Sequence, residues 1–291
     1  MALSAVEAVE IFGIVAFVIS MVILISASIS DWREREVSDA HWIVLGVIGL
    51  AMFVSYSVYN TGFRWEYICL TAGTAMIIMD ILYDRDNHFI YYALMALFFI
   101  VPFYNNMDND LFRAWISIPL CYMIYVGMYL FKIIRGGADA KCLITLSIMF
   151  PLYPSFLGLP TIDIPINGMS QIFVCSISVL FIAAVLTTPM VLYIALRGAK
   201  ENGLSGRIFS GYRMDISKAE NSDVWPLEDM IDGKLVSIKI PDEEDMSDIY
   251  ARLREAGYEN VKVTPMIPFI VLITAALAVL VLLGNPVFLI S

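Results

Sequence analysis

The chain has 291 residues, of which 59% are hydrophobic, and its mean hydropathy is +0.77. These values are too high for a soluble chain of this length and indicate an integral membrane protein. The formal net charge of −10 argues against nucleic acid as a partner, because DNA and RNA are themselves negatively charged.

Long apolar stretches recur from one end of the chain to the other. Stretches of about 17 to 25 apolar residues can cross the hydrocarbon as helices, because a helix satisfies its own backbone hydrogen bonds. We therefore expect an all-α polytopic membrane protein with about eight transmembrane helices. Their predicted positions are residues 8–30, 40–59, 67–83, 88–105, 112–134, 142–158, 171–196 and 266–284.

The first apolar stretch is interpreted as a retained helix. Its start carries Glu7 and Glu10, where a secretory signal peptide needs basic residues. Charged residues follow the stretch in place of a cleavage site with small residues.

Basic residues in the short connections set the expected orientation. One side of the membrane collects Arg33, Arg35, Arg85, Lys132, Arg135 and Lys141, whereas the other collects only Arg64 and Arg113. The basic connections are therefore predicted to lie in the cytoplasm, with both termini outside the cell membrane. Four predicted crossings separate Asp31 from Asp139, so both carboxylates are expected at the cytoplasmic surface.

A polar segment at residues 197–264 predicts a small cytosolic α/β domain. It would lie between a membrane-embedded bundle, residues 1–196, and a C-terminal helix within residues 265–291 that completes the bundle. Residues 234–240 alternate like a strand, and residues 241–257 have the early acids, late bases and final glycine of a helix. With a second strand at 260–264 they would form a β-α-β unit. Residues 199–229 are expected to form a loop.

The cysteines give no sign of a metal or disulfide framework. Cys69, Cys121, Cys142 and Cys175 lie singly within apolar stretches, and no two have the spacing of metal ligands. We expect no metal site and no cofactor.

Asp31 and Asp139 are the candidate catalytic residues. Two neighbouring carboxyl groups tend to share one proton, so that the ionised member can activate a water molecule while the other protonates a carbonyl oxygen. This chemistry hydrolyses a peptide bond without a metal ion. Each aspartate also has a simpler interpretation, Asp31 as the polar end of a helix and Asp139 as part of an ordinary tight loop.

The residues around the two aspartates suit such a site. Gly136 and Gly137 permit unusual backbone conformations and close approach of a substrate strand, and Ala138 keeps the turn narrow. Lys141 would either favour the charged form of the carboxylate or anchor the next helix in lipid headgroups.

Three further residues are candidates for contacts with substrate or lipid. Arg33 and Arg35 follow Asp31 and are interpreted as contacts to substrate or to anionic headgroups. Asp80 lies within the third predicted span, where an acid is either functional, for example in orienting substrate, or a hydrogen-bonded packing residue.

Two segments resemble the motifs of archaeal prepilin and preflagellin peptidases. The segment Asp31-Trp-Arg-Glu-Arg-Glu-Val-Ser-Asp-Ala-His-Trp42 is similar to the first aspartate motif of that family. The segment Gly136-Gly-Ala-Asp-Ala-Lys141 resembles the second motif, Gly-x-Gly-Asp, with Ala138 in place of the second glycine. The segment Thr264-Pro-Met-Ile-Pro-Phe269 resembles the C-terminal region of the archaeal members.

The resemblance implies an aspartic-type endopeptidase of the Gly-x-Gly-Asp class, with Asp31 and Asp139 as its catalytic pair. It also implies that the substrates are type IV pilin-like or archaellin precursors. Such an enzyme removes short basic leader peptides on the cytoplasmic side, just before the apolar helix of the precursor. Bacterial relatives with a cysteine-rich insertion also methylate the new amino terminus. The cysteine pattern here predicts peptidase activity without methylation.

Two rival functions remain open at this point. A presenilin-like or signal-peptide-peptidase-like protease shares the Gly-x-Gly-Asp motif but has its first aspartate in a Tyr-Asp pair within a helix, whereas Tyr83-Asp84 lies in a predicted loop. A channel or transporter would line an ion path with Asp31, Asp80 and Asp139, and predicts polar residues throughout the spans.

Overall fold

The chain folds into two compact units. The computed structural model describes residues 5–82, 89–104, 106, 109–161, 175–202, 211–239, 241 and 246–284, with backbone alone at 5–9 and 201–202. The helical unit comprises Met1–Val185 and Pro268–Ser291, and the small unit comprises Leu186–Ile267. The sequence places the corresponding boundaries at 196/197 and 264/265.

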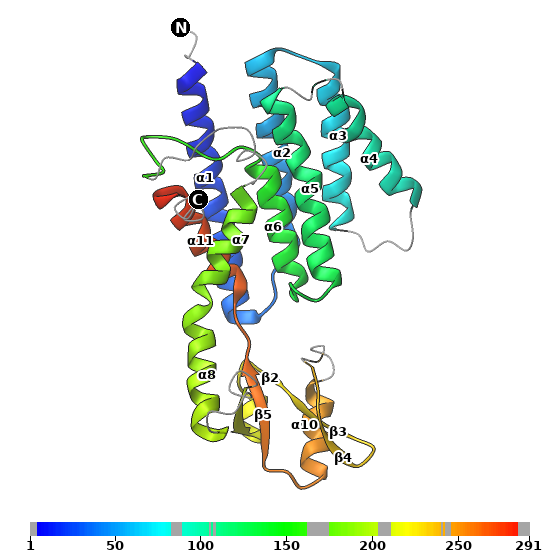
Figure 1. Cartoon of the computed structure of the whole chain (residues 1–291), viewed down its shortest axis with the longest axis vertical. Coiled ribbons are helices and arrows are strands. Elements are labelled where there is room, and N and C mark those ends of the chain that lie inside the picture. Colours follow the sequence, from blue (N-terminus) through cyan, green and yellow to red (C-terminus); the bar gives the residue numbers. More distant parts are fainter. Residues whose placement is uncertain are drawn as a thin grey trace. The chain divides into compact units, whose positions relative to one another are not determined.

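The described part of the helical unit is mainly helical (Figure 1). They are α1 (Ala5–Glu34), α2 (Ala40–Thr61), α3 (Trp65–Asp80), α4 (Phe89–Tyr104), α5 (Asp110–Leu130), α6 (Gly137–Met149), α7 (Cys175–Leu186) and α11 (Phe269–Leu283). Helix α6 packs against α2 and α5, and α1 packs against α2 and α11. The two motif segments, residues 31–42 and 136–141, therefore belong to one packed body.

Helix α6 lies in the core of the helical unit. Every residue from Cys142 to Phe150 is buried. Gly49 on α2 allows this helix to approach closely, because a Cβ atom there would lie 2.8 Å from the Cα atom of Met149. Pro151 follows the helix and disfavours α conformation in the residue before it, so α6 ends at Met149 instead of extending to residue 158.

Four helices among the described residues are long and apolar enough to cross a membrane, and the chain is a multi-pass membrane protein. They are Glu10–Glu34, Ala40–Thr61, Asp110–Leu130 and Cys175–Lys200. The predicted number of eight spans is too high, because α3, α4, α6 and α11 have only 13 to 16 residues, whereas about 20 are needed. Two of the shorter helices, Phe89–Tyr104 and Phe269–Leu283, are nevertheless apolar.

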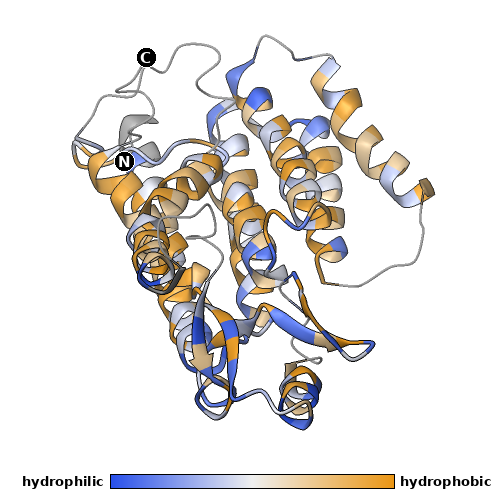
Figure 2. Cartoon of the chain, turned by 60° about the horizontal axis from the view of Figure 1, so that its bottom comes forward, coloured by the Kyte–Doolittle hydropathy of each residue, from blue (hydrophilic) through white to orange (hydrophobic). Residues whose placement is uncertain are grey.

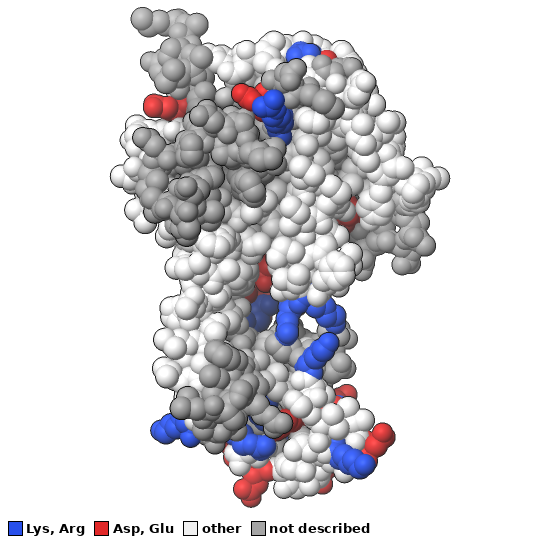
Figure 3. Space-filling model, viewed as in Figure 1, with Lys and Arg blue, Asp and Glu red and all other residues white. Residues whose placement is uncertain are grey.

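The surface of the helical unit agrees with a lipid environment. Its helices are hydrophobic along much of their length (Figure 2), and their visible flanks are mostly free of charge (Figure 3). Many large apolar side chains are exposed, including Val22, Ile68 and Ile100. In water such a surface would be unfavourable, whereas in lipid it is solvated.

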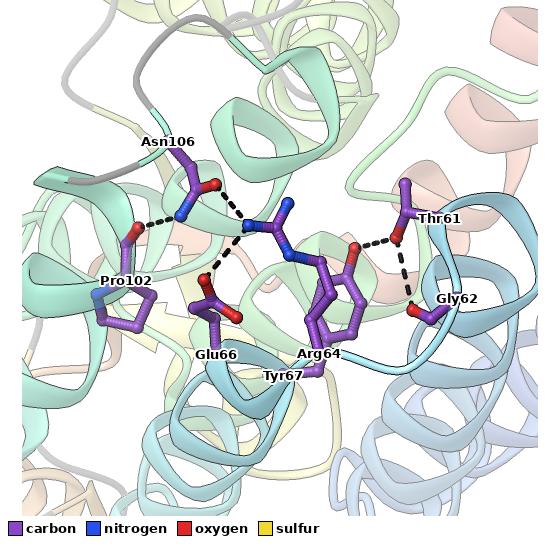
Figure 4. A network of polar contacts seen from close by, with 7 residues as sticks. All are labelled: Thr61, Gly62, Arg64, Glu66, Tyr67, Pro102 and Asn106. Atoms are coloured by element: carbon purple, nitrogen blue, oxygen red, sulfur yellow. Dashed lines mark hydrogen bonds and ion pairs between the residues drawn. The ribbon is translucent and has the colours of Figure 1, made fainter.

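Polar side chains form a hydrogen-bonded network around the connection between α2 and α3 (Figure 4). Arg64 donates to Glu66 at 3.1 Å and to Asn106 at 2.8 Å. Glu66 is buried, so its charge requires the guanidinium partner. Tyr67 and Thr61 are joined by a hydrogen bond within the same network.

The small unit is built on antiparallel strands. Strands β1 (Tyr212–Asp215) and β2 (Val224–Pro226) flank β5 (Asn260–Pro265) in a three-stranded sheet. Strands β3 (Glu228–Ile231) and β4 (Lys234–Ser237) form a hairpin. Its turn, Asp232-Gly233, has φ angles of +52° and +72°, as favoured in a two-residue hairpin turn.

Helices complete this unit. They are α8 (Thr188–Asn202), α9 (Ile216–Glu220) and α10 (Met246–Glu255). One apolar cluster, including Tyr212, Leu253 and Val261, forms its core. Arg252 on α10 forms two hydrogen bonds to the carboxylate of Asp229, at 3.0 and 2.7 Å.

The α/β character expected for this segment is present, but the predicted β-α-β unit is wrong. Strand β4 pairs with β3, and β5 pairs with β1 and β2. These partners lie within residues 212–231, most of which were expected to form a loop. Their strands have only three or four residues, so polar loop composition concealed them.

Candidate functional site

Asp31 and Asp139 lie at helix ends within the helical unit. Asp31 is in the last turn of α1, and Asp139 is in the first turn of α6, ahead of the apolar segment that starts at Cys142. Both side chains are partly buried. The negative charge of Asp31 acts on the carboxyl group of Asp139, so the two predicted candidates lie within electrostatic range of each other.

The environment of Asp139 favours its neutral form. Burial, followed by the negative charge of Asp31, raises the pKa of the Asp139 carboxyl from the ordinary 3.8 to about 7. An aspartate with a pKa near neutrality can both hold and release a proton at physiological pH.

The environment of Asp31 provides partners for a carboxylate. The backbone N–H of Ile270 donates to Asp31 Oδ2 at 3.2 Å. Ile270 lies in the first turn of α11, where backbone N–H groups have no partner within the helix and the helix dipole favours negative charge. The positive charge of Arg35 also attracts the Asp31 carboxylate.

The glycine turn before α6 is shaped around the Asp139 side chain. A Cβ atom on Gly136 would lie 2.9 Å from Cγ of Asp139, so a side chain there would collide with the carboxyl group. A Cβ atom on Gly137 would come no closer than 3.8 Å, to the hydroxyl group of Tyr129. Ala138 forms part of the first turn of α6 and is only partly buried. A side chain at position 136 would therefore displace the Asp139 carboxyl group, whereas a methyl group at position 137 would make ordinary contacts.

Lys141 has a partner that the sequence interpretation missed. Its ammonium group donates to Oδ1 of Asp39 at 2.7 Å and forms an ion pair with it. Asp39 is the residue that immediately precedes α2. The contact joins the first turn of α6 to the start of α2.

Arg33 lies beside the site. With Trp32 on α1 it lines a mostly apolar groove of about 580 Å³ between α1 and α11. On the α11 side the groove is lined by small or branched residues such as Val271 and Ala275. Arg35 has a φ angle of +56°, which turns the chain sharply after α1 ends.

Asp80 is separate from the pair of aspartates. It lies at the end of α3, where its carboxylate accepts hydrogen bonds from Tyr92 at 3.1 Å and from Tyr122. These bonds connect α3 to α4 and α5. The arrangement favours the interpretation of Asp80 as a packing acid over that of a substrate contact.

Several residues considered in the sequence lie outside the described parts of the chain. They are Tyr83, Asp84, Arg85, Asp86, His88, Asp108 and Asp163. Among the residues that the structure describes, no group of three or more His, Cys, Asp or Glu side chains could hold a metal ion. The four cysteines are present as free thiols.

The sequence did not predict the bond from Ile270 to Asp31 or the ion pair between Asp39 and Lys141. Ile270 contributes through its backbone, so its side chain carries no signal. The available signal was Pro268, which marks a helix start and therefore a set of unpaired N–H groups.

A scan against models of protein families finds no match. The chain is similar to the uncharacterized protein MJ1282.1 of Methanocaldococcus jannaschii, with 23% identity over 142 residues. The similarity covers 48% of this chain and 51% of that protein, so the chain spans about half the length of the curated relative it matches.

Proposed function

We propose that this protein is a membrane aspartic endopeptidase that removes basic leader peptides from type IV pilin-like or archaellin precursors. The observation that carries the proposal is the electrostatic interaction between Asp31 and Asp139, whose flanking segments both resemble the motifs of archaeal prepilin and preflagellin peptidases. Two carboxyl groups within electrostatic range at the edge of an apolar bundle can divide the work of acid and base.

The surroundings of the pair suggest how the roles are divided at rest. Partial burial of Asp31 opposes ionisation of its carboxyl group, whereas the Ile270 N–H group and Arg35 favour the carboxylate. Asp139, with its pKa raised to about 7, is the member of the pair that retains a proton up to near-neutral pH. The ionised member takes a proton from the attacking water, and the protonated member donates to the carbonyl oxygen. The proton is shared by the pair, so the roles exchange during turnover.

The position of the site suits a substrate that is itself anchored in the membrane. The groove between α1 and α11 is mostly apolar and ends at Trp32 and Arg33, next to Asp31. An apolar precursor helix lying in this region would leave its polar leader at the membrane surface. Arg33, Arg35, Lys132, Arg135 and Lys141 cluster in the segments near the pair, which supports a cytoplasmic location by the positive-inside rule. The outside location of both termini stays a prediction.

Of the two rival functions, the channel or transporter has less support, and the presenilin-like protease stays an alternative prediction. The Tyr83-Asp84 pair that a presenilin-like mechanism would use lies outside the described residues. A channel would need an accessible Asp80, whereas this carboxylate is bonded to two tyrosines.

The test is cleavage of a pilin-like precursor with a basic leader by the purified protein in detergent. We expect leader removal by the wild-type protein and its loss in both Asp31→Asn and Asp139→Asn. Asp110→Asn serves as the matched control. Asp110 is an exposed acid that pairs with Arg113, and both residues lie on α5, which carries neither Asp31 nor Asp139. Cleavage at the wild-type rate by either Asp31→Asn or Asp139→Asn would refute the proposal.

A further inference from the structure

The start of α2 forms polar contacts with the two helices that carry the aspartates. Asp39 is ion-paired with Lys141 of α6 at 2.7 Å, across 102 positions of sequence. Two residues later, Nε2 of His41 lies 3.1 Å from the hydroxyl oxygen of Ser26 on α1. The same short segment of chain therefore contacts the end of α1 and the beginning of α6.

The orientation of Asp39 is unusual for its position. An aspartate immediately before a helix normally accepts a hydrogen bond from a backbone N–H group of the first turn. Asp39 occupies this position before α2 but forms no such bond through its side chain. Its carboxylate is directed instead to Lys141.

Helix geometry couples this ion pair to Asp139. Residues two positions apart on a helix lie about 200° apart around its axis, so Lys141 and Asp139 emerge on opposite faces of α6. Lys141 faces α2, and Asp139 is within the electrostatic reach of Asp31 on α1. A rotation of the first turn that separates Lys141 from Asp39 would also turn Asp139 away from its present surroundings.

The first turn of α6 depends on such contacts more than the rest of the helix does. Gly136, Gly137, Ala138 and Asp139 are only partly buried, whereas α6 is fully buried from Cys142 onward. Apolar packing thus holds the body of α6, and polar contacts hold its first turn.

We propose that Asp39 and Lys141 are a positioning pair that holds the first turn of α6 so that Asp139 faces Asp31. The inference rests on the proposed function in assigning this geometry to catalysis. Asp39 and Lys141 do not touch the reacting atoms in this scheme. They act through the orientation of Asp139.

The charged and titratable groups around Asp139 come from several elements. Asp31 faces it from α1, with Arg35 just beyond that helix, and Cys142 follows it on α6. Tyr129 of α5 lies near the glycine turn. Asp39 and Lys141 form an ion pair close to the same turn. Because the pKa of Asp139 depends on its surroundings, its protonation reports how these groups are arranged.

The test uses infrared difference spectroscopy of the Asp139 carboxyl group as a function of pH, with Asp139→Asn providing the subtraction. Loss of positioning moves Asp139 toward solvent and away from Asp31. We therefore expect both Asp39→Asn and Lys141→Gln to lower the titration midpoint of Asp139 by about one pH unit. The reversed pair, Asp39→Lys with Lys141→Asp, should restore the midpoint.

This pattern differs from that of a purely electrostatic effect. Removing a negative charge lowers the pKa of a carboxyl group, and removing a positive charge raises it. Shifts of opposite sign in Asp39→Asn and Lys141→Gln, or no shift in either, would overturn the proposal. The control is Asp110→Asn, which breaks the ion pair between Asp110 and Arg113 (3.0 Å) and should leave the midpoint of Asp139 unchanged.

The variants are expected to fold, because an ion pair with both partners partly exposed contributes at most about 1 kcal/mol to stability. In the cleavage assay we expect kcat to fall about tenfold or more in both single variants, with KM unchanged, and to recover in the reversed pair. An absence of cleavage by the wild-type protein, together with the expected infrared shifts, would refute the proposed function and leave the positioning pair intact. Wild-type cleavage without those shifts would refute the positioning pair alone.

Discussion

The carboxylate of Asp31, in the last turn of α1, accepts a hydrogen bond at 3.2 Å from the backbone N–H of Ile270, in the first turn of α11. The two residues are 239 positions apart in the sequence. Ile270 is almost fully buried, at 1% exposure, so its N–H group has little access to water. Asp31 therefore has a structural role at the start of α11 in addition to its proposed catalytic role.

These two roles can be separated by substitution. Asp31→Asn keeps a side-chain oxygen that can accept from Ile270, so we expect loss of cleavage with stability nearly unchanged. Asp31→Ala leaves a buried N–H group without its partner, and we expect it to reduce the free energy of unfolding by about 1–3 kcal/mol. Thermal unfolding of both variants in detergent measures the difference. Equal midpoints for Asn and Ala would show that the hydrogen bond contributes nothing to stability.

The two glycines before Asp139 are predicted to differ in their tolerance of alanine. In Gly136→Ala the new methyl group would meet Cγ of Asp139 at 2.9 Å and displace the carboxyl group. We expect a loss of cleavage of about a hundredfold, as found for displacements of about 1 Å in catalytic groups. Gly137→Ala is the matched control, since its methyl group has ordinary contacts and should leave the rate nearly unchanged. The prediction is wrong if the two variants lose activity equally.

The raised pKa of Asp139 predicts a pH-dependent effect of Asp139→Asn on stability. The carboxyl group has a pKa of about 7 in the folded protein and about 3.8 when unfolded. Between these values the folded state binds more protons, so the stability of the wild-type protein falls as pH rises toward 7. Asp139→Asn has no titrating carboxyl group at this position, so its stability does not fall in this way as pH rises.

We therefore expect the difference in Tm between Asp139→Asn and wild type to grow from pH 4 to pH 7 and then to level off. The Asn variant should unfold several degrees higher than wild type at pH 8. At pH 4 its Tm should be close to that of wild type. Unfolding scans across this range, with Asp110→Asn as the control, provide the measurement. A difference that is constant with pH would show that Asp139 titrates normally.

Asp80 is predicted to matter for folding and not for cleavage. Asp80→Ala removes the acceptor for Tyr92 and Tyr122, so the link from α3 to α4 and α5 is lost. We expect a destabilisation of about 1–3 kcal/mol, with the cleavage rate per folded molecule retained. Combining it with Tyr122→Phe should add less than the sum of the single effects, because both changes remove the same bond. Loss of cleavage in a stably folded Asp80 variant would assign this acid to the site.

The prediction that Asp31 and Asp139 lie together rested on a count of crossings, which the structure does not support. Four crossings were expected between the two residues, yet only α2 and α5 among the intervening described helices are long and apolar enough to span. The two carboxyl groups nevertheless lie within electrostatic range of each other. Two crossings, like four, return the chain to the same side, and α1 and α6 both pack against α2. That Asp31 and Asp139 meet as a catalytic pair stays a prediction.

Other differences have local physical causes. Proline at 151 ended α6 nine residues before the predicted limit, because an apolar stretch was read as helix through to residue 158. Strands β1 and β2 and the first half of β3 lie where the sequence predicts a loop, because short strands with polar residues carry little periodic signal. The helix α10 and the strand β5 carried clearer patterns and were expected at nearly the observed positions.

The amino-acid sequence by itself determined that this is a membrane protein with a small polar unit before its last helix. Hydrophobic composition and periodicity are local properties, and they are sufficient for these conclusions. Only the tertiary structure decided that Asp31 bonds to the start of α11, that Lys141 pairs with Asp39, and that Asp80 is bound by two tyrosines. Each of these contacts joins different helices, and their meeting depends on how the helices pack, which no local pattern of residues specifies.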